Sequence, residues 1–528
     1  MNKFLHAAFA AVILLCAGHA HAGTASLNIV LVLDGLRPDA IDAQETPNLW
    51  RLRQEGVIFL NSHSVFPTVT RVNSTAIATG MYPEHNGVFG NTMYVRAVDA
   101  AHAFGNDDHK NLLHLDAATG GHMVLAKSLA ELLAERGKTL AVVHSGTTGS
   151  ALLGNPRGPQ GTGILINAWW EPGVRVGFPD RVNDAILRRF PPAPPAGGAQ
   201  DSFVDRVTWT EHVLRDYVLP ELKPDVVVNW LTEPDHTQHA RGPGSPPARA
   251  AIRNDDREVG LLLDRLRELG LADKTNILVV SDHGFAHSDF GVDLTGELIK
   301  AGLKASADSD DVVIASSGEA MLLHVRDHDA ARIDALVRFL QKQPWTGVLF
   351  TAAKAGGATE GREEGTFALD LIHLAQSDRA PDIVMTFPWS SARGPGGLPG
   401  TSYTQAKTTG PLAGTAGNHG NMSPWTVRNT FIAWGIDFKR GVALRTPAGN
   451  VDLAPTLLAL MNLDHDVDLA QFDGRPLREA FAGGIDEEQI AADTRTYTVA
   501  TADGAYRAAL QLTEVGRFRY VDKSWRMK

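Results

Sequence analysis

The sequence predicts an α/β protein with a largely parallel central sheet flanked by helices. Short runs rich in valine, isoleucine and leucine alternate with helical patterns, which is typical of a parallel sheet buried on both faces. Acidic residues directly follow several of these runs, and such folds place their sites at the carboxyl ends of strands. Since 528 residues exceed what one hydrophobic core usually serves, we expect one large domain with an added subdomain.

The first 22 residues predict a cleaved signal peptide. They carry one positive charge, at Lys3, then an apolar run from Ala7 to Ala17 and small residues up to Ala22. This run is too short to span a bilayer comfortably, so we expect cleavage after Ala22, no stable membrane anchor and a periplasmic or secreted protein. The single cysteine, Cys16, lies in this segment. The mature chain therefore cannot rely on disulfide bonds.

The strand and helix patterns divide the rest of the chain into a core made of two stretches and a subdomain inserted between them. A helix is expected from Pro246, with its apolar positions on one face, up to Gly270. Four buried strands are expected at 28–33, 139–143, 225–231 and 276–280. We expect the catalytic core to comprise 23–293 and 411–528, the latter with C-terminal strands, and an inserted small α/β cap subdomain at 294–410 with a strand at 320–325 and a helix at 329–341.

Aspartate and histidine residues gather in short strings that follow the predicted strands. Zinc binds carboxylate oxygen and imidazole nitrogen, and a glycine-flanked histidine and a loop threonine accompany these strings. Together they predict a bimetal hydrolase site around a threonine. The residues are Asp34 in "IVLVLDGLRPD", Thr70 in "FPTVTRVNST", Asp235 and His239 in "TEPDHTQHARGP", Asp282 and His283 in "VVSDHGF", and His419 in "AGNHGNMS".

The order and spacing of these strings resemble the alkaline phosphatase superfamily. The resemblance is closest to the type I phosphodiesterase and nucleotide pyrophosphatase/phosphodiesterase group, and it runs from about Leu27 to about Leu463. It implies an alkaline-phosphatase-like fold and two Zn²⁺ ions, with other divalent metals as an alternative. It also implies the ligand sets: Asp34, Thr70, Asp282 and His283 for one ion, and Asp235, His239 and His419 for the other.

The resemblance further implies an exported metal-dependent phosphodiesterase or nucleotide pyrophosphatase that acts on a small-molecule phosphate ester. Thr70 would be the nucleophile, and the reaction would pass through a covalent phosphothreonine. Asn91, in "NGVFGNTMY", stands where the family places an asparagine that donates to a phosphoryl oxygen. The alternative for Asn91 is a structural role in the turn after Gly90.

Two departures from related enzymes concern the charge of the substrate. A threonine-nucleophile branch of monoesterases has a Lys-x-Arg unit after the strand that here ends at His144, whereas this chain has Thr147 and Gly149. That difference favours diesters or pyrophosphate-type bonds. Nucleotide-cleaving relatives often have an aromatic residue after the nucleophile, and this chain has Arg71. Arg71 would contact a phosphate or an anionic leaving group, or else pair with a structural acid.

Two other classes of function stay open at this point. One is a phosphomonoesterase or phosphonate-ester hydrolase on the same scaffold, and the other is a non-catalytic metal-binding or ligand-binding protein. Relative rates on aryl monoesters and diesters separate the first from a diesterase, and a Thr70→Ala protein with unchanged function would support the second. The net charge of −11 provides no basic footprint for nucleic acid.

Overall fold

The computed structural model describes residues 25–171, 173–195, 203–414 and 416–528. The predicted signal peptide at 1–22 lies outside these ranges. Within them, no helix is both long and apolar enough to cross a bilayer.

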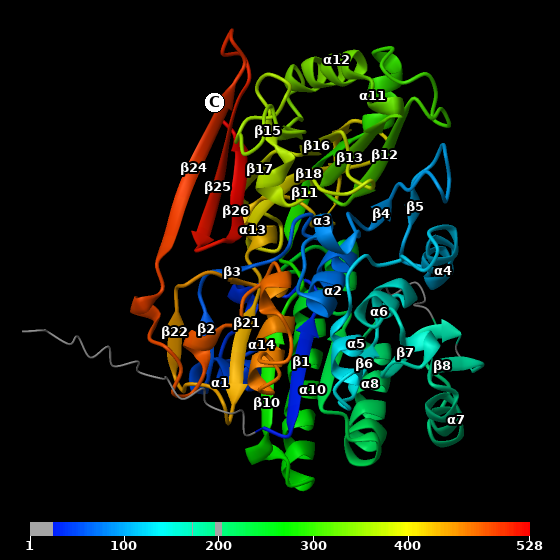
Figure 1. Ribbon diagram of the computed structural model, residues 1–528, viewed down its shortest axis with the longest axis vertical. Helices are drawn as coiled ribbons and strands as arrows, with labels where there is room; N and C mark the ends of the chain where they lie inside the picture. Colours follow the sequence, from blue (N-terminus) through cyan, green and yellow to red (C-terminus); the bar gives the residue numbers. More distant parts are fainter. Residues whose placement is uncertain (1–24, 172, 196–202, 415) are drawn as a thin grey trace, which may run out of the picture.

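A nine-stranded sheet occupies the centre of the lower half of the molecule in Figure 1. The five strands from β10 to β7 run parallel to one another, whereas β21 and β8 are antiparallel to their neighbours. This confirms the largely parallel sheet, and the four expected strands appear as β1, β6, β9 and β10. In sheet order the strands are β22 (Val442–Leu444), β2 (Val57–Phe59), β21 (Phe431–Gly435), β10 (Thr275–Val280), β1 (Leu27–Leu33), β9 (Val226–Leu231), β6 (Leu140–His144), β7 (Ile164–Glu171) and β8 (Arg175–Phe178).

Alternating side chains of β1 enter two hydrophobic clusters, one on each face of the sheet. Ile29 and Leu31 belong to the cluster that contains α10, whereas Val30 and Val32 belong to the cluster that contains α14. Burial on both faces explains why β1 has no polar alternation. The first cluster takes side chains from α1 (Pro47–Glu55), α7 (Asp180–Arg189), α8 (Val204–Val213) and α10 (Pro246–Glu268); the second takes them from α2 (Thr70–Thr79), α4 (His109–Ala118), α5 (Leu129–Ala134), α6 (Thr148–Gly154) and α14 (Leu453–Leu460).

A second layer of sheets lies above the large sheet in Figure 1. One sheet has the order β12-β13-β16-β14-β15 and is accompanied by helices α11 and α12, so the expected strand and helix are confirmed as β13 and α12. The other has the order β17-β18-β11-β19, with β20 paired to β11. The elements are β11 (Ala286–Val292), α11 (Leu294–Lys300), β12 (Val312–Ser317), β13 (Ala320–Val325), α12 (Ala330–Gln341), β14 (Leu349–Thr351), β15 (Phe367–Ala368), β16 (Ile383–Thr386), β17 (Trp389–Arg393), β18 (Pro399–Gln405), β19 (Gly410–Pro411) and β20 (Gly417–Asn418).

The C-terminal strands form a three-stranded antiparallel sheet at the side of the molecule (Figure 1). It consists of β24 (Ala492–Ala500), β25 (Arg507–Val515) and β26 (Phe518–Arg526). Its apolar residues Val499, Leu510 and Val521 join the hydrophobic cluster of the second layer. The C-terminal strands therefore pack mainly on the segment expected to be the cap.

Candidate active site

Three adjacent parallel strands bring the predicted aspartates to one edge of the large sheet. Asp34 follows β1, Asp282 follows β10, and Asp235 is the first residue of α9 (Asp235–Arg241), which comes shortly after β9. The two neighbours of β1 in the sheet are β9 and β10. The carboxyl ends of these strands meet at the same edge, which explains why residues about 250 positions apart in the sequence share one site.

Two of the aspartates have one carboxylate oxygen held by hydrogen bonds. Oδ2 of Asp34 accepts from the indole N–H of Trp230 at 2.9 Å. Oδ1 of Asp282 accepts from the backbone N–H groups of Gly35 and His283, each at 3.0 Å. Among the described residues, Oδ1 of Asp34, Oδ2 of Asp282 and Oδ1 of Asp235 are buried and have no hydrogen-bond partner. Each aspartate thus presents one buried oxygen with unused acceptor capacity.

The three predicted histidines are oriented in the same way. In each of them Nδ1 lies close to a backbone carbonyl oxygen. The distance is 3.2 Å from Nδ1 of His239 to the oxygen of Gly417, 3.0 Å from Nδ1 of His283 to that of Gly284, and 2.9 Å from Nδ1 of His419 to that of Thr68. A carbonyl oxygen only accepts, so each Nδ1 carries the proton and donates it. In the neutral form of each ring, Nε2 then has a free lone pair and can bind a metal.

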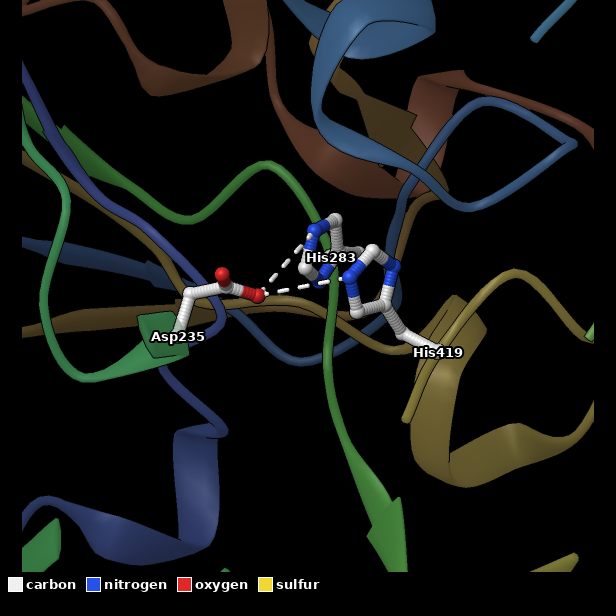
Figure 2. Close-up of side chains that lie close together, drawn as sticks. All are labelled: Asp235, His283 and His419. Atoms are coloured by element: carbon white, nitrogen blue, oxygen red, sulfur yellow. Dashed lines mark ion pairs between the residues drawn. The ribbon is translucent and has the colours of Figure 1, made fainter. Parts of the chain in front are cut away.

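These nitrogens face the unpaired carboxylate oxygens. Nε2 of His283 lies 3.1 Å from Oδ2 of Asp282 and 3.6 Å from Oδ1 of Asp34. Oδ1 of Asp235 lies 3.9 Å from Nε2 of His283 and 3.3 Å from Nε2 of His419, as the dashed lines in Figure 2 show. The ligand atoms of Asp34, Asp282 and His283 fall within 4.8 Å of one another, and so do those of Asp235, His283 and His419.

The structure therefore brings together six of the predicted ligands, with His283 central to both groups. His239, on the exposed side, completes the second group, because its Nε2 lies 3.4 Å from Oδ1 of Asp235 and 3.1 Å from Nε2 of His419. Two imidazole lone pairs at 3.1 Å repel one another unless a proton or a metal ion lies between or beside them. The donor set of carboxylate oxygen and imidazole nitrogen fits a divalent metal such as zinc.

The electrostatics of the site also favour a cation. Burial, and then the negative charges of Asp282 and Asp235, raise the pKa of Asp34 well above its usual value. Burial, and then the neighbouring His283, lower the pKa of His419 to about 4. His419 is thus neutral near pH 7. Against the effect of burial, Asp282 and Asp235 raise the pKa of His283, so without a metal the positive charge beside the carboxylates comes from a proton on that ring. A bound metal would supply that charge.

Thr70 lies beside this group of ligands at the start of helix α2. Its Oγ1 is 3.3 Å from Nε2 of His283, and the residue is buried. The backbone before Thr70 is extended at Val69, and the chain enters the helix with the Thr70 hydroxyl next to the side chain of His283. The structure thus places the predicted threonine in direct contact with one of the predicted ligands.

Asn91 also lies next to the threonine. Oδ1 of Asn91 accepts from the backbone N–H of Arg71 at 3.0 Å, and the backbone N–H of Asn91 donates to Oγ of Ser317 at 3.1 Å. Because Oδ1 is engaged, the amide NH₂ of Asn91 is the part of the side chain available to donate elsewhere. This orientation is what a donor to a phosphoryl oxygen requires.

A comparison of the sequence with the profiles of known protein families identifies the family of this chain. The sequence profile described as type I phosphodiesterase / nucleotide pyrophosphatase matches residues 28–410. The chain belongs to this family. Venom phosphodiesterase 2 of Crotalus adamanteus is 26% identical over 262 residues, which are 48% of this chain and 26% of that protein. Ectonucleotide pyrophosphatase/phosphodiesterase family member 1 of Rattus norvegicus is 26% identical over 263 residues, which are 48% of this chain and 24% of that protein. The chain thus spans about a quarter of the length of these relatives.

In this type I phosphodiesterase family member, Arg71 extends from the first turn of α2 towards Thr147. Its Nη2 donates to Oγ1 of Thr147 at 3.3 Å. Burial lowers its pKa, while Asp107 and then Asp34 act in the opposite direction. A Cβ at Gly149 would lie 1.9 Å from the backbone oxygen of Asn106, so no side chain fits at that position. The loop after β6 thus has neither a cation nor room for one at Gly149.

Several residues that support the site were not predicted from the sequence. Trp230 holds Asp34, the carbonyl of Thr68 orients His419, and Ser317 accepts from the loop that carries Asn91. Trp230 lies within an apolar strand and gives no sequence signal that separates it from a core residue. His236, which neighbours the predicted ligands in the sequence, packs its ring against Phe203 instead, with centroids 3.6 Å apart.

Proposed function

We propose that this protein is an exported, metal-dependent phosphodiesterase of the phosphodiesterase or nucleotide pyrophosphatase type, with a covalent phosphothreonine intermediate. The observation that carries the proposal is the shared orientation of the three histidines. Each has Nδ1 at a backbone carbonyl and directs Nε2 at buried carboxylate oxygens that have no hydrogen bond among the described residues. The Thr70 hydroxyl lies at the same place.

We propose two zinc ions as cofactors. Asp34, Asp282 and His283, with Thr70, would hold one ion, and Asp235, His239 and His419 the other. The distances give His283 a place near both groups. When bound, the metals would supply positive charge for the phosphoryl group and lower the pKa of the threonine hydroxyl.

The residues of the chain then divide the remaining work. Thr70 gives its proton to solvent, and its Oγ1 bonds to phosphorus while the bond from phosphorus to the leaving oxygen breaks. The leaving oxygen departs with the bonding electron pair and takes up a proton from solvent where its basicity requires one. Asn91 donates from its amide to a non-bridging phosphoryl oxygen and stabilises the charge that develops there. A water molecule then adds its hydroxyl to phosphorus and gives a proton to Oγ1 of Thr70 as the bond between phosphorus and Oγ1 breaks. This returns the free hydroxyl and releases a phosphate monoester.

The test is turnover of bis(p-nitrophenyl) phosphate with added zinc by the wild type, Thr70→Ala and Thr70→Ser. We expect Thr70→Ala to lose at least about a thousandfold in kcat, because the nucleophile is gone. Thr70→Ser keeps a hydroxyl and should retain measurable turnover. Acid quenching during turnover should trap a phosphoryl group on the peptide that contains Thr70, by mass spectrometry.

Two results would overturn the proposal. One is a folded Thr70→Ala protein with turnover close to that of the wild type. The other is full activity after exhaustive chelation, since the proposal requires a metal at the carboxylates. The melting temperature of each variant shows whether a loss of activity reflects unfolding.

A further inference from the structure

Two buried nitrogen atoms, one on the residue after Thr70 and one at the end of β6, have no hydrogen-bond partner among the described residues. They are Nε of Arg71 and Nε2 of His144. A buried donor that stays unpaired costs roughly 1–3 kcal/mol, so such donors are rare unless a ligand uses them. The mechanism proposed above uses neither residue.

Arg71 is held in place at both ends. Its backbone N–H donates to Asn91, and its Nη2 donates to Oγ1 of Thr147, the residue that precedes α6. The side chain is half-buried, and in the described part of the chain no carboxylate forms an ion pair with it. Asp107, whose charge acts most strongly on the pKa of Arg71, is itself exposed. Arg71 thus keeps a positive charge at the nucleophile that no acid neutralises by direct contact.

His144 contributes a neutral donor from the neighbouring strand. It is the last residue of β6 and fully buried, and its ring stacks on Trp230 with centroids 5.0 Å apart. Its Nδ1 accepts from the backbone N–H of Gly146 at 2.9 Å, so the ring proton lies on Nε2. That N–H is the donor without a partner. Both residues contact the loop that follows β6: Nη2 of Arg71 donates to Oγ1 of Thr147, and Nδ1 of His144 accepts from Gly146.

The surrounding loop cannot provide an alternative cation. Thr147 uses its hydroxyl on Arg71 and on Oγ of Ser150, and the backbone of Asn106 fills the space beside Gly149. Arg71 is therefore the cation that the structure offers next to Thr70. A guanidinium group forms paired, charge-assisted hydrogen bonds with phosphate oxygens, whereas an aromatic residue in its place would offer a stacking surface.

We propose that Arg71, assisted by His144, binds an additional anionic group that the substrate carries at or next to the scissile phosphorus. This inference rests on the proposed function and concerns the charge of the phosphate ester that the same site accepts. The preferred substrates are phosphate esters with a second negative charge close to the reacting centre. Two sources have this chemistry: the adjoining phosphate of a pyrophosphate bond, and the doubly charged phosphoryl group of a terminal monoester. Diesters with two uncharged substituents are the poorer substrates.

The experiment compares kcat/KM for three substrates in the holoenzyme. UDP-glucose carries an adjoining phosphate, p-nitrophenyl phosphate carries a dianionic phosphoryl group, and bis(p-nitrophenyl) phosphate carries neither. Arg71→Met removes the charge at similar length, and Arg71→Lys keeps the charge without the planar fork. Arg338→Met is the matched control, because Arg338 lies on the exposed face of α12 and pairs with Asp334 there.

We expect Arg71→Met to lose about tenfold to a hundredfold on one or both of the doubly charged substrates. The loss on bis(p-nitrophenyl) phosphate should be at least about tenfold smaller, Arg71→Lys should lie between, and Arg338→Met should match the wild type. His144→Phe keeps the stacked ring and removes the N–H, so it should lose activity in the same pattern to a smaller extent. A loss confined to UDP-glucose identifies the adjoining phosphate as the ligand, and a loss confined to p-nitrophenyl phosphate identifies the terminal phosphoryl group.

Equal losses on all three substrates, or no loss, would overturn the inference. So would a wild type that turns over only bis(p-nitrophenyl) phosphate. These outcomes differ from failure of the proposed function, which Thr70→Ala reports separately. If Arg71→Met does not fold, the same three-substrate comparison is made with Arg71→Lys. A larger loss on the doubly charged substrates than on bis(p-nitrophenyl) phosphate supports the inference, and equal losses on all three overturn it.

Discussion

The indole N–H of Trp230 donates to Oδ2 of Asp34, and this contact leaves the other oxygen of Asp34 as the one that faces His283. Both residues are buried. A hydrogen bond of this kind fixes the rotation of a carboxylate that binds metal, and loss of such contacts typically weakens metal binding about tenfold to a hundredfold. The contact therefore leads to the first prediction.

Trp230→Phe should bind zinc about tenfold more weakly than the wild type, as measured by competition with a chromophoric chelator. The ring volume is largely kept, so the main loss is the N–H donor. Trp170→Phe is the control, since Trp170 is also buried but packs against His109 and Phe178. Unchanged affinity in Trp230→Phe would show that Asp34 needs no such support.

Removal of metal should destabilise the protein. Asp34, Asp235 and Asp282 present buried oxygens without hydrogen bonds among the described residues, and an uncompensated buried charge is costly. Ligand at a thousand times its Kd stabilises a protein by about 4 kcal/mol. We expect EDTA to lower the melting temperature by at least about 5 °C and zinc to restore it. EDTA should shift the melting temperature of Asp235→Asn by less. A wild type whose melting temperature does not change with EDTA would contradict the prediction.

His283 and His239 should differ in their effect on metal content. Nε2 of His283 faces Asp34, Asp235 and Asp282, whereas Nε2 of His239 faces Asp235 and His419. We expect His239→Gln to retain about one metal equivalent and His283→Gln to retain less, because loss of a central ligand weakens both groups. Elemental analysis after dialysis measures this. Equal retention by the two variants would assign His283 to one group alone.

Ser317→Ala tests whether the hairpin between β12 and β13 positions Asn91. Oγ of Ser317 accepts from the backbone N–H of Asn91 and also lies against Gly90, where a Cβ would come within 2.1 Å of it. Loss of one hydrogen bond of roughly 1 kcal/mol predicts about a fivefold lower kcat with little change in KM. The neighbouring Ser316→Ala serves as the control. If both variants keep the wild-type kcat, the hairpin does not position Asn91 for the reaction.

Glu319 predicts a loss of stability at alkaline pH. Burial raises the pKa of this carboxyl to about 8, although Ser402 donates a hydrogen bond to it. The folded protein therefore holds a proton that the unfolded chain releases above about pH 4.5, so stability falls as pH rises from that value through pH 8. Glu319→Gln removes the titration. The melting temperature of Glu319→Gln minus that of the wild type should therefore increase as the pH rises from 6 to 9.

The exposed Glu360→Gln variant is the control for this pH dependence. Its melting temperature should stay parallel to that of the wild type over the same range. A constant difference between Glu319→Gln and the wild type from pH 6 to pH 9 would show that Glu319 is ionised in the folded protein.

The sequence predicts those parts of the molecule that depend on local patterns. Buried parallel strands are continuous apolar runs, so β1, β6, β9 and β10 were found within about one residue of their bounds. The side chains after them meet at one edge as a consequence of parallel topology. For this reason Asp34 and Asp282 could be grouped without a structure.

Contacts that depend on tertiary packing could not be predicted. The donor that holds Asp34 comes from the adjacent strand, in a position that otherwise looks like core. Ser317 reaches Asn91 from 226 residues further along the chain. The spacing of "SDHG" also does not show that His283 lies near Asp235 as well as Asp34. Such relations are set by the packing of whole elements, and sequence patterns do not encode them separately.

The position of β1 has a consequence for how the chain folds. Its partners in the sheet are β9 and β10. Both are synthesised about 200 or more residues after β1. Until then the apolar strand has two unpaired edges, which are sites for aggregation. Pairings this distant in sequence also form slowly. A truncated chain that ends before β9 should therefore be prone to aggregate or be degraded, and chaperones that bind extended apolar segments would find their earliest target at residues 27–33.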